Sequence, residues 1–308
     1  MICPTLPEPA EDGEMESRRH RVGTPDGRSL DVMDAGEPAG SVVYCHHGSP
    51  GSCVLAPEWV EDATRRGLRL ISHSRPGYGG SDRLEGRTVG QVVSDVATVL
   101  DHLGVGRFAT WGLSGGGPHA LACAALLPDR VVAAASISGV APYGVEGLDW
   151  LEGMGEMNVQ ECQMAISGDR AAVLASADAM AEALRQAGPE EFAREMATLL
   201  TPVDAAAVAG PFGGFLAASA AEGLARSGAG SADDDLAFFS PWGFEVGSIT
   251  VPVQIWQGEQ DLMVPAAHGA WLAAHIPGAE AHLEPSLGHL TVAATRIGEV
   301  HSWLAGHL

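Results

Sequence analysis

The segment Gly112-Leu113-Ser114-Gly115-Gly116 constrains the possible folds of this chain more than any other feature. It follows a short apolar run at 108–111 and precedes an Ala- and Leu-rich stretch at 115–127, so it predicts a sharp turn from a strand into a helix. A serine on such a turn stands above the sheet, where the next N–H group and the helix N-terminus favour negative charge. We therefore take Ser114 as the candidate nucleophile. The plainer alternative is a glycine-rich turn with a capping serine.

Apolar runs alternate with amphipathic stretches along most of the chain. The runs predict a hairpin at 18–34 and buried strands at 41–45, 68–71, 108–111, 131–137, 251–256 and 281–283. The stretches between them predict helices at 57–66, 88–103, 115–127, 266–275 and 291–305. Such alternation predicts an α/β fold with a doubly wound, mostly parallel sheet.

The alternation stops near residue 140. From 143 to 240 the pattern is helical and has no strong strand run. The sequence therefore predicts one α/β core, built from 18–142 and 241–308, that is interrupted by an inserted helical cap at 143–240. The acidic, Pro-containing stretch 1–17 is expected to be a flexible tail.

A serine nucleophile needs a base, and the base needs a group that orients it. His289 follows the last predicted strand, in a loop just before the final helix, and Asp261 follows the strand at 251–256. Both would lie at the carboxyl edges of neighbouring strands, where α/β sheets build their sites. The chain order Ser, Asp, His is also the order expected for a nucleophile on such a turn. His119 and Glu259 are weaker candidates for the two roles, because His119 is expected to pack on a helix.

A developing oxyanion needs two N–H donors. Gly115 would supply one, and Ser49 would supply the other from the loop His46-His47-Gly48-Ser49-Pro50-Gly51, unless that loop is a plain Gly/Pro turn. The residues expected to touch a substrate are His47, Leu113, Trp150, Met154 and Met157. For the three in the insertion, the alternative is that they simply pack the cap onto the core.

Composition excludes several classes of partner. The 17 basic residues are all arginine and the net charge is −22, so the surface repels nucleic-acid phosphates and anionic lipid. No H-E-x-x-H or comparable metal spacing occurs, and we expect neither a metal nor a cofactor. The five cysteines are odd in number and lack CxxC spacing, which fits a reducing compartment. The sequence shows no secretory signal or membrane span, so we expect a cytoplasmic protein. Its expected partner is a small-molecule substrate, and a homodimer is an open alternative to a monomer.

Taken together, the motifs resemble those of the α/β-hydrolase superfamily over about residues 20–307. The matching segments are His47-Gly48-Ser49-Pro50, Arg75-Pro76-Gly77-Tyr78-Gly79-Gly80-Ser81, the turn at Ser114, the segment at Asp261, and Gly288-His289. One departure is Ser74, where relatives often carry Asp. The resemblance implies a cofactor-free hydrolase with a helical cap, in which Ser114 attacks a carbonyl carbon and His289 transfers the proton.

The motifs are far less specific for a reaction than for a fold. The first expectation is hydrolysis of a small, largely apolar carboxylic ester. An aminopeptidase similar to proline iminopeptidases is an alternative, since Glu146, Glu152, Glu156 or another cap glutamate could bind an amino group. Cofactor-free haloperoxidases, C–C bond hydrolases and small-molecule receptors also use this fold. Haloalkane dehalogenases and epoxide hydrolases are disfavoured, because they need Asp where this chain has Ser114.

Overall fold

The computed structural model describes residues 17–186, 194 and 197–308. They form an eight-stranded sheet in the order β1-β2-β4-β3-β5-β6-β7-β8, in which β1, β2 and β4 pair antiparallel and all other neighbours pair parallel. The strands are β1 (Arg18–Gly23), β2 (Ser29–Gly36), β3 (Ser41–His46), β4 (Leu68–His73), β5 (Phe108–Leu113), β6 (Val131–Ile137), β7 (Val253–Gly258) and β8 (Glu280–Glu284). The predicted fold class, an α/β fold with a mostly parallel sheet, is confirmed.

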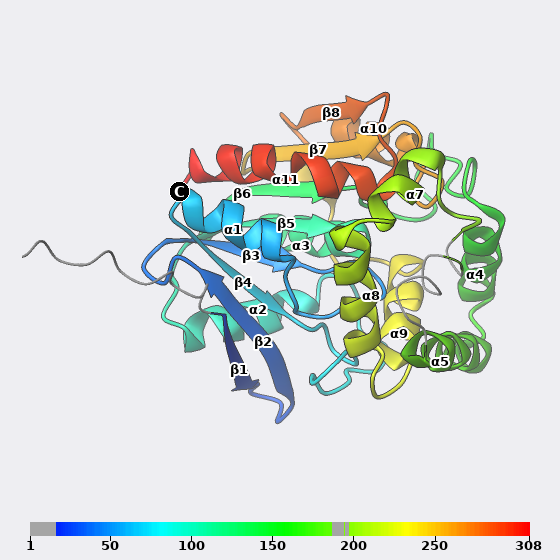
Figure 1. Cartoon of the computed structure of the whole chain (residues 1–308), viewed down its shortest axis with the longest axis horizontal. Helices are drawn as coiled ribbons and strands as arrows, with labels where there is room; N and C mark the ends of the chain where they lie inside the picture. Colours follow the sequence, from blue (N-terminus) through cyan, green and yellow to red (C-terminus); the bar gives the residue numbers. More distant parts are fainter. Residues whose placement is uncertain (1–16, 187–193, 195–196) are drawn as a thin grey trace, which may run out of the picture.

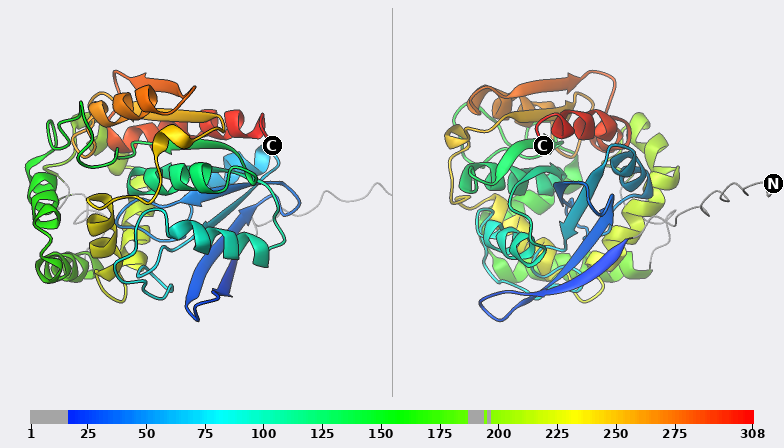
Figure 2. Two further views of the ribbon diagram at one scale, coloured as in Figure 1. Left: turned by 180° about the vertical axis from the view of Figure 1, so that it is seen from behind. Right: turned by 90° about the vertical axis from the view of Figure 1, so that its left-hand side faces the viewer.

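Helices cover both faces of the sheet. On one face lie α1 (Pro57–Arg65) and α11 (His289–Ala305), and on the other lie α2 (Val92–His102), α3 (Gly117–Leu126) and α10 (Ala266–His275) (Figures 1 and 2). Strand residues are buried between the two helical layers, and two separate apolar cores result. Strand β5 is buried along its whole length, as a central parallel strand should be.

Further helices lie between β6 and β7 in the chain: α4 (Glu156–Ser167), α5 (Arg170–Gln186), α7 (Pro202–Val208), α8 (Pro211–Gly223) and α9 (Ala229–Phe238). In Figure 1 most of them stand beyond the end of the sheet toward which β5, β6 and β7 point. They fall within the range 143–240, and we call them the inserted helices. Their role as a cap remains a prediction, as do the domain boundaries, and the stretch 1–16 lies outside the described residues.

The structure corrects several element boundaries. The helix predicted at 88–103 begins only at Val92, because the N–H of Thr88 bonds the Gln91 side chain and forms a turn. Trp150 and Met154 lie in the non-helical segment before α4 and not on a helix. The final helix begins at His289, so the expectation that this residue sits in a loop before the helix was wrong. Its start is fixed by a buried carboxylate described below.

No single described helix is long and apolar enough to span a membrane. The pair α7 and α8 passes the test of length and composition together, but it is bent by 77°.

Candidate active site

Ser114 has the strained backbone expected of a nucleophile on a sharp turn. It directly follows β5 and opens a short 3-10 turn that leads into α3. Its φ of 52° lies in the left-handed region, which a non-glycine residue adopts only when its surroundings enforce it. The neighbouring Gly115 has no room for a side chain, because a Cβ there would overlap the Ser49 hydroxyl. The glycine therefore allows the loop that carries Ser49 to lie directly against the nucleophile turn.

His289 and Asp261 form a buried, hydrogen-bonded pair. The distance from His289 Nδ1 to Asp261 Oδ2 is 2.7 Å, and the two residues are 2% and 3% exposed. They follow the neighbouring strands β8 and β7, as the sequence predicted. Burial alone would lower the pKa of His289, but the negative charges of Asp261 and Asp204 outweigh it and raise that pKa. The pair is thus arranged to stabilise an imidazolium.

Asp261 is itself fixed by the turn that follows β7. Its Oδ1 accepts the backbone N–H groups of Met263 and Val264, each at 2.8 Å, and its Oδ2 accepts the Gln257 side-chain amide at 2.8 Å. The carboxylate therefore organises a turn and orients His289 at the same time. The competing Glu259 is exposed.

Two other histidines near Ser114 have their ring nitrogens directed elsewhere. His47 Nε2 accepts the Arg75 backbone N–H at 3.0 Å and its Nδ1 donates to the Gly48 carbonyl, so burial and the nearby Arg75 charge keep its pKa well below the usual value. His119 is fully buried, its Nδ1 lies 3.2 Å from the Val89 carbonyl, and burial lowers its pKa to about 4. Neither histidine is disposed as a base for Ser114.

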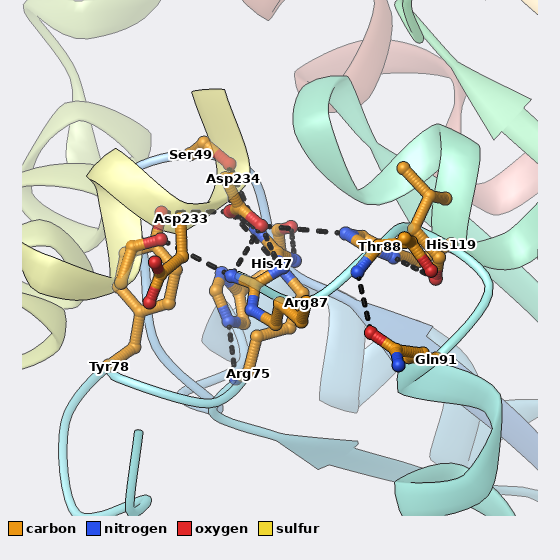
Figure 3. Close-up of polar contacts among 12 residues, drawn as sticks. His47, Ser49, Arg75, Tyr78, Arg87, Thr88, Gln91, His119, Asp233 and Asp234 are labelled. Atoms are coloured by element: carbon orange, nitrogen blue, oxygen red, sulfur yellow. Dashed lines mark hydrogen bonds and ion pairs between the residues drawn. The ribbon is translucent and has the colours of Figure 1, made fainter. Parts of the chain in front are cut away.

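The loop with the predicted oxyanion donor Ser49 is held from behind by a buried ionic cluster (Figure 3). Arg75, which is fully buried, donates to the carbonyls of His47 and Gly48. Its guanidinium also donates to the Ser49 hydroxyl at 2.9 Å and to Asp234 on α9 at 2.7 Å. The loop is thereby tied to an inserted helix.

Asp234 is the centre of this cluster. Its carboxylate accepts hydrogen bonds or ion pairs from Arg75, Arg87, the Tyr78 hydroxyl and the Ser49 hydroxyl. Burial alone would raise the pKa of Asp234, but the charges of Arg75 and Arg87 hold it well below its usual range. Asp234 could not be predicted from the sequence, because an aspartate within a helical stretch carries no motif. For Arg75 the only sequence signal is its place in the segment Arg75–Ser81, which resembles the family.

A cavity of about 500 Å³ lies over Ser114, Gly115, Ser49 and His289. All five residues predicted to contact substrate line it: His47, Leu113, Trp150, Met154 and Met157. Much of the remaining wall is apolar and includes Leu55, Trp59, Val140, Met180, Leu184 and Phe215. The arrangement brings a serine, a carboxylate-bound histidine and an apolar chamber together, which suits nucleophilic attack on an uncharged acyl group.

One polar feature of the cavity was not foreseen. Glu161 on α4 and Asp235 on α9 line the same chamber and share a hydrogen bond. Burial raises the pKa of both carboxyls, and the hydrogen bond lowers that of Glu161 while it raises that of Asp235. Both pKa values are raised because the two carboxyls lie side by side in a buried setting, where ionisation of both is disfavoured.

Among the described residues, Asp31, Cys53 and Glu222 form a group whose possible metal-donor atoms all lie within 4.8 Å of one another. The Arg19 guanidinium bonds both carboxylates of this group, and its Nη2 lies 3.6 Å from the Cys53 sulfur. An arginine thus occupies the position that a cation would take.

Comparisons with known proteins agree with this architecture. The model of the alpha/beta hydrolase fold family matches residues 41–293, and the chain belongs to that family. A bifunctional esterase/perhydrolase of Acinetobacter calcoaceticus is 32% identical over 130 residues, which are 41% of this chain and 46% of that protein. The chain thus spans only about half the length of this relative.

Two further proteins align over most of the chain. A 2-hydroxy-6-oxononadienedioate/2-hydroxy-6-oxononatrienedioate hydrolase of Cupriavidus pinatubonensis is 26% identical to this chain. The alignment covers 91% of this chain and 86% of the length of that hydrolase. The structure of a thermophilic esterase from Thermogutta terrifontis superposes with a TM-score of 0.67 at 21% identity, over 94% of this chain and all of the esterase. The structural likeness supports the fold.

Proposed function

We propose that this protein is a serine hydrolase that cleaves a small, largely apolar carboxylic ester. The observation that carries the proposal is the 2.7 Å bond between His289 and Asp261, beside a cavity that His289 shares with Ser114. The apolar wall favours an uncharged acyl chain, because burial of apolar surface is the main source of affinity there.

The mechanism follows from the roles of the three side chains. His289 takes the proton of the Ser114 hydroxyl as the oxygen attacks the carbonyl carbon, and Asp261 stabilises the imidazolium that forms. The N–H groups of Gly115 and Ser49 stabilise the oxyanion of the tetrahedral intermediate. His289 then protonates the leaving alcohol, which leaves Ser114 acylated. In the second step His289 takes a proton from water, which attacks the acyl-enzyme, and returns that proton to the Ser114 oxygen as the acid is released. The inserted helices would act as a cap that limits the access of bulk water.

The test is labelling with a fluorophosphonate probe, combined with turnover of p-nitrophenyl butyrate. We expect the probe to modify Ser114 alone, as read by mass spectrometry of the labelled peptide, and Ser114→Ala to abolish both labelling and turnover. Labelling that persists in Ser114→Ala would remove the nucleophile assignment. Labelling of Ser114 without ester turnover would favour a receptor or another reaction of the same fold.

The acid pair in the cavity favours a second candidate, an aminopeptidase-like hydrolase. Glu161 and Asp235 place two carboxyl groups in the cavity wall, which would suit a substrate with an ammonium group near the scissile bond. Glu146, Glu152 and Glu156, the glutamates considered from the sequence, are not among the described residues that line the chamber. Comparing kcat/KM for an alanine p-nitrophenyl ester and its N-acetyl form separates the two candidates. A preference for the free amine that disappears in Glu161→Gln would support the second.

The acidic lining of the cavity disfavours a dianionic substrate. The relative from Cupriavidus is named for a dioate, which carries two carboxylates. The described residues lining the present chamber include the Glu161–Asp235 pair and no arginine. A dicarboxylate would meet these carboxyl groups here without a basic counter-ion among the described lining residues.

A further inference from the structure

The residue at the N-cap position of helix α11 is a glycine, which has no side chain to cap the helix. Gly288 precedes His289, at the position where Ser, Thr, Asp or Asn normally accepts the free N–H groups of a first helical turn. Asp204, on the inserted helix α7, accepts them instead. The helix that starts with the candidate base is therefore capped by a carboxylate from a distant part of the chain.

The contacts of Asp204 are specific and complete. Its Oδ2 accepts the His289 N–H at 2.8 Å, and its Oδ1 accepts the N–H groups of Leu290 and Thr291 at 2.9 Å each. The Thr291 hydroxyl donates to Oδ1 at 3.0 Å and accepts the Gly288 N–H at 2.7 Å. Asp204 is fully buried, and no arginine pairs with it in the described part of the chain. Its charge is balanced by the helix N-terminus.

Gly288 is what makes this approach possible. A Cβ at Gly288 would overlap the Asp204 carboxylate, so any larger residue would push the two elements apart. On the other side, the Ser138 hydroxyl donates to the His289 carbonyl at 2.9 Å. The backbone of His289 is thus held at its N–H by Asp204 and at its carbonyl by Ser138.

We propose that Asp204 is a positioning residue for the reaction: it fixes the backbone of His289 and supplies a negative charge that offsets the helix N-terminus. This inference rests on the proposed function in one respect, that His289 is the base. The titratable groups acting on the imidazole are Asp261, through a direct bond, and Asp204, through space. A helix N-terminus alone disfavours an imidazolium, so Asp204 keeps the ring basic where the helix would make it less so.

The main variant is Asp204→Asn, which keeps the shape and removes the charge. NMR titration of the His289 ring, assigned with His289→Gln, should show a pKa lower by roughly half a unit. The plateau of kcat/KM for the ester should fall about tenfold, because the base is less well placed. The acidic limb of the pH profile of kcat/KM should move to lower pH, because the His289 pKa is lower. The control is Asp95→Asn, which removes a buried charge paired with Arg28 away from the site. This control should lose stability but should change neither the His289 pKa measured by NMR nor the pH profile of kcat/KM.

Gly288→Ala is the second variant, for use if Asp204→Asn does not fold. It retains the charge but displaces it, and should lower both the His289 pKa and the kcat/KM plateau. The control is Gly298→Ala on the same helix. A Cβ at Gly298 would lie 3.5 Å from its nearest neighbour, an ordinary contact, so this variant should change neither the His289 pKa nor the kcat/KM plateau.

An unchanged His289 pKa, together with a rate loss no larger than the loss of folded protein, would overturn the positioning role. If the wild-type protein neither labels nor turns over, the proposed function fails. The NMR titration would still decide whether Asp204 acts on His289.

Discussion

The Ser49 hydroxyl donates a 2.6 Å hydrogen bond to the buried carboxylate of Asp234, which lies 185 residues later in the chain. The loop with the proposed oxyanion donor is therefore fixed by an inserted helix, through a carboxylate that also neutralises two buried arginines. Because uncompensated buried charge is costly, this contact should matter for stability as well as for catalysis.

We expect Asp234→Asn to destabilise the protein by about 3–5 kcal/mol, because Arg75 and Arg87 lose their shared counter-ion while they remain buried. Urea unfolding monitored by tryptophan fluorescence measures the loss. The control is the adjacent Asp233→Asn, whose partner Arg83 is 33% exposed and can turn to solvent, so that about 1 kcal/mol is expected. Equal losses in the two variants would contradict a special role for the Asp234 cluster.

The pH dependence of the wild-type reaction follows from the raised pKa of His289. As a base His289 must be neutral, so kcat/KM should be low in acid and rise as the pH passes through that pKa. Burial would lower the value, but the charge and hydrogen bond of Asp261 outweigh it, so the midpoint should lie above 6.5. A pH profile with a neutral ester measures it, and a midpoint well below 6.5 would mean that another group controls the rate.

Asp261→Asn should leave the fold intact and lower kcat by about 10⁴-fold. The amide oxygen can still accept the N–H groups of Met263 and Val264, which places the amide N–H₂ against His289 Nδ1. The ring would then carry its proton on Nε2 and could not accept one from Ser114. Circular dichroism and steady-state kinetics test this, with the exposed Glu259→Gln as control. Nearly full activity in Asp261→Asn would assign the acid to another residue.

Met154→Gln and Met157→Gln should alter the choice of acyl chain more than the chemistry. Both side chains line the cavity, and an amide on this wall would disfavour long apolar chains. We expect kcat/KM to fall several-fold for octanoate relative to acetate esters, while Ser114 labelling is retained. A constant ratio across the acyl series in both folded variants would show that these methionines only pack.

Local sequence signals were sufficient for the sheet and for the positions of the candidate triad. The strand-to-helix turn at Ser114 is a local pattern, and the sequence interval between Asp261 and His289 has room for α10 and β8, which places both residues at one edge of the sheet. Periodicity found the helices because their apolar faces pack against that sheet.

What could not be predicted depends on contacts between distant segments. Asp204 and Asp234 lie in helices with no motif, and only the tertiary fold brings them to the candidate base His289 and to the loop of Ser49. The start of α11 was misplaced for the same reason: a glycine gives no capping signal when the cap comes from 85 residues away. The Glu161–Asp235 pair is likewise formed by two separate helices and has no signature in either.

The contacts that Asp204 and Asp234 make with the core affect how this protein could be re-engineered. Exchanging the whole insertion for that of a relative would remove the supports of both the candidate base and the proposed oxyanion loop. Such a chimera should therefore lose activity on every substrate. Redesign confined to α4 and α5 leaves α7 and α9 in place. Libraries aimed at new substrates should therefore vary the first two inserted helices and keep these two aspartates constant.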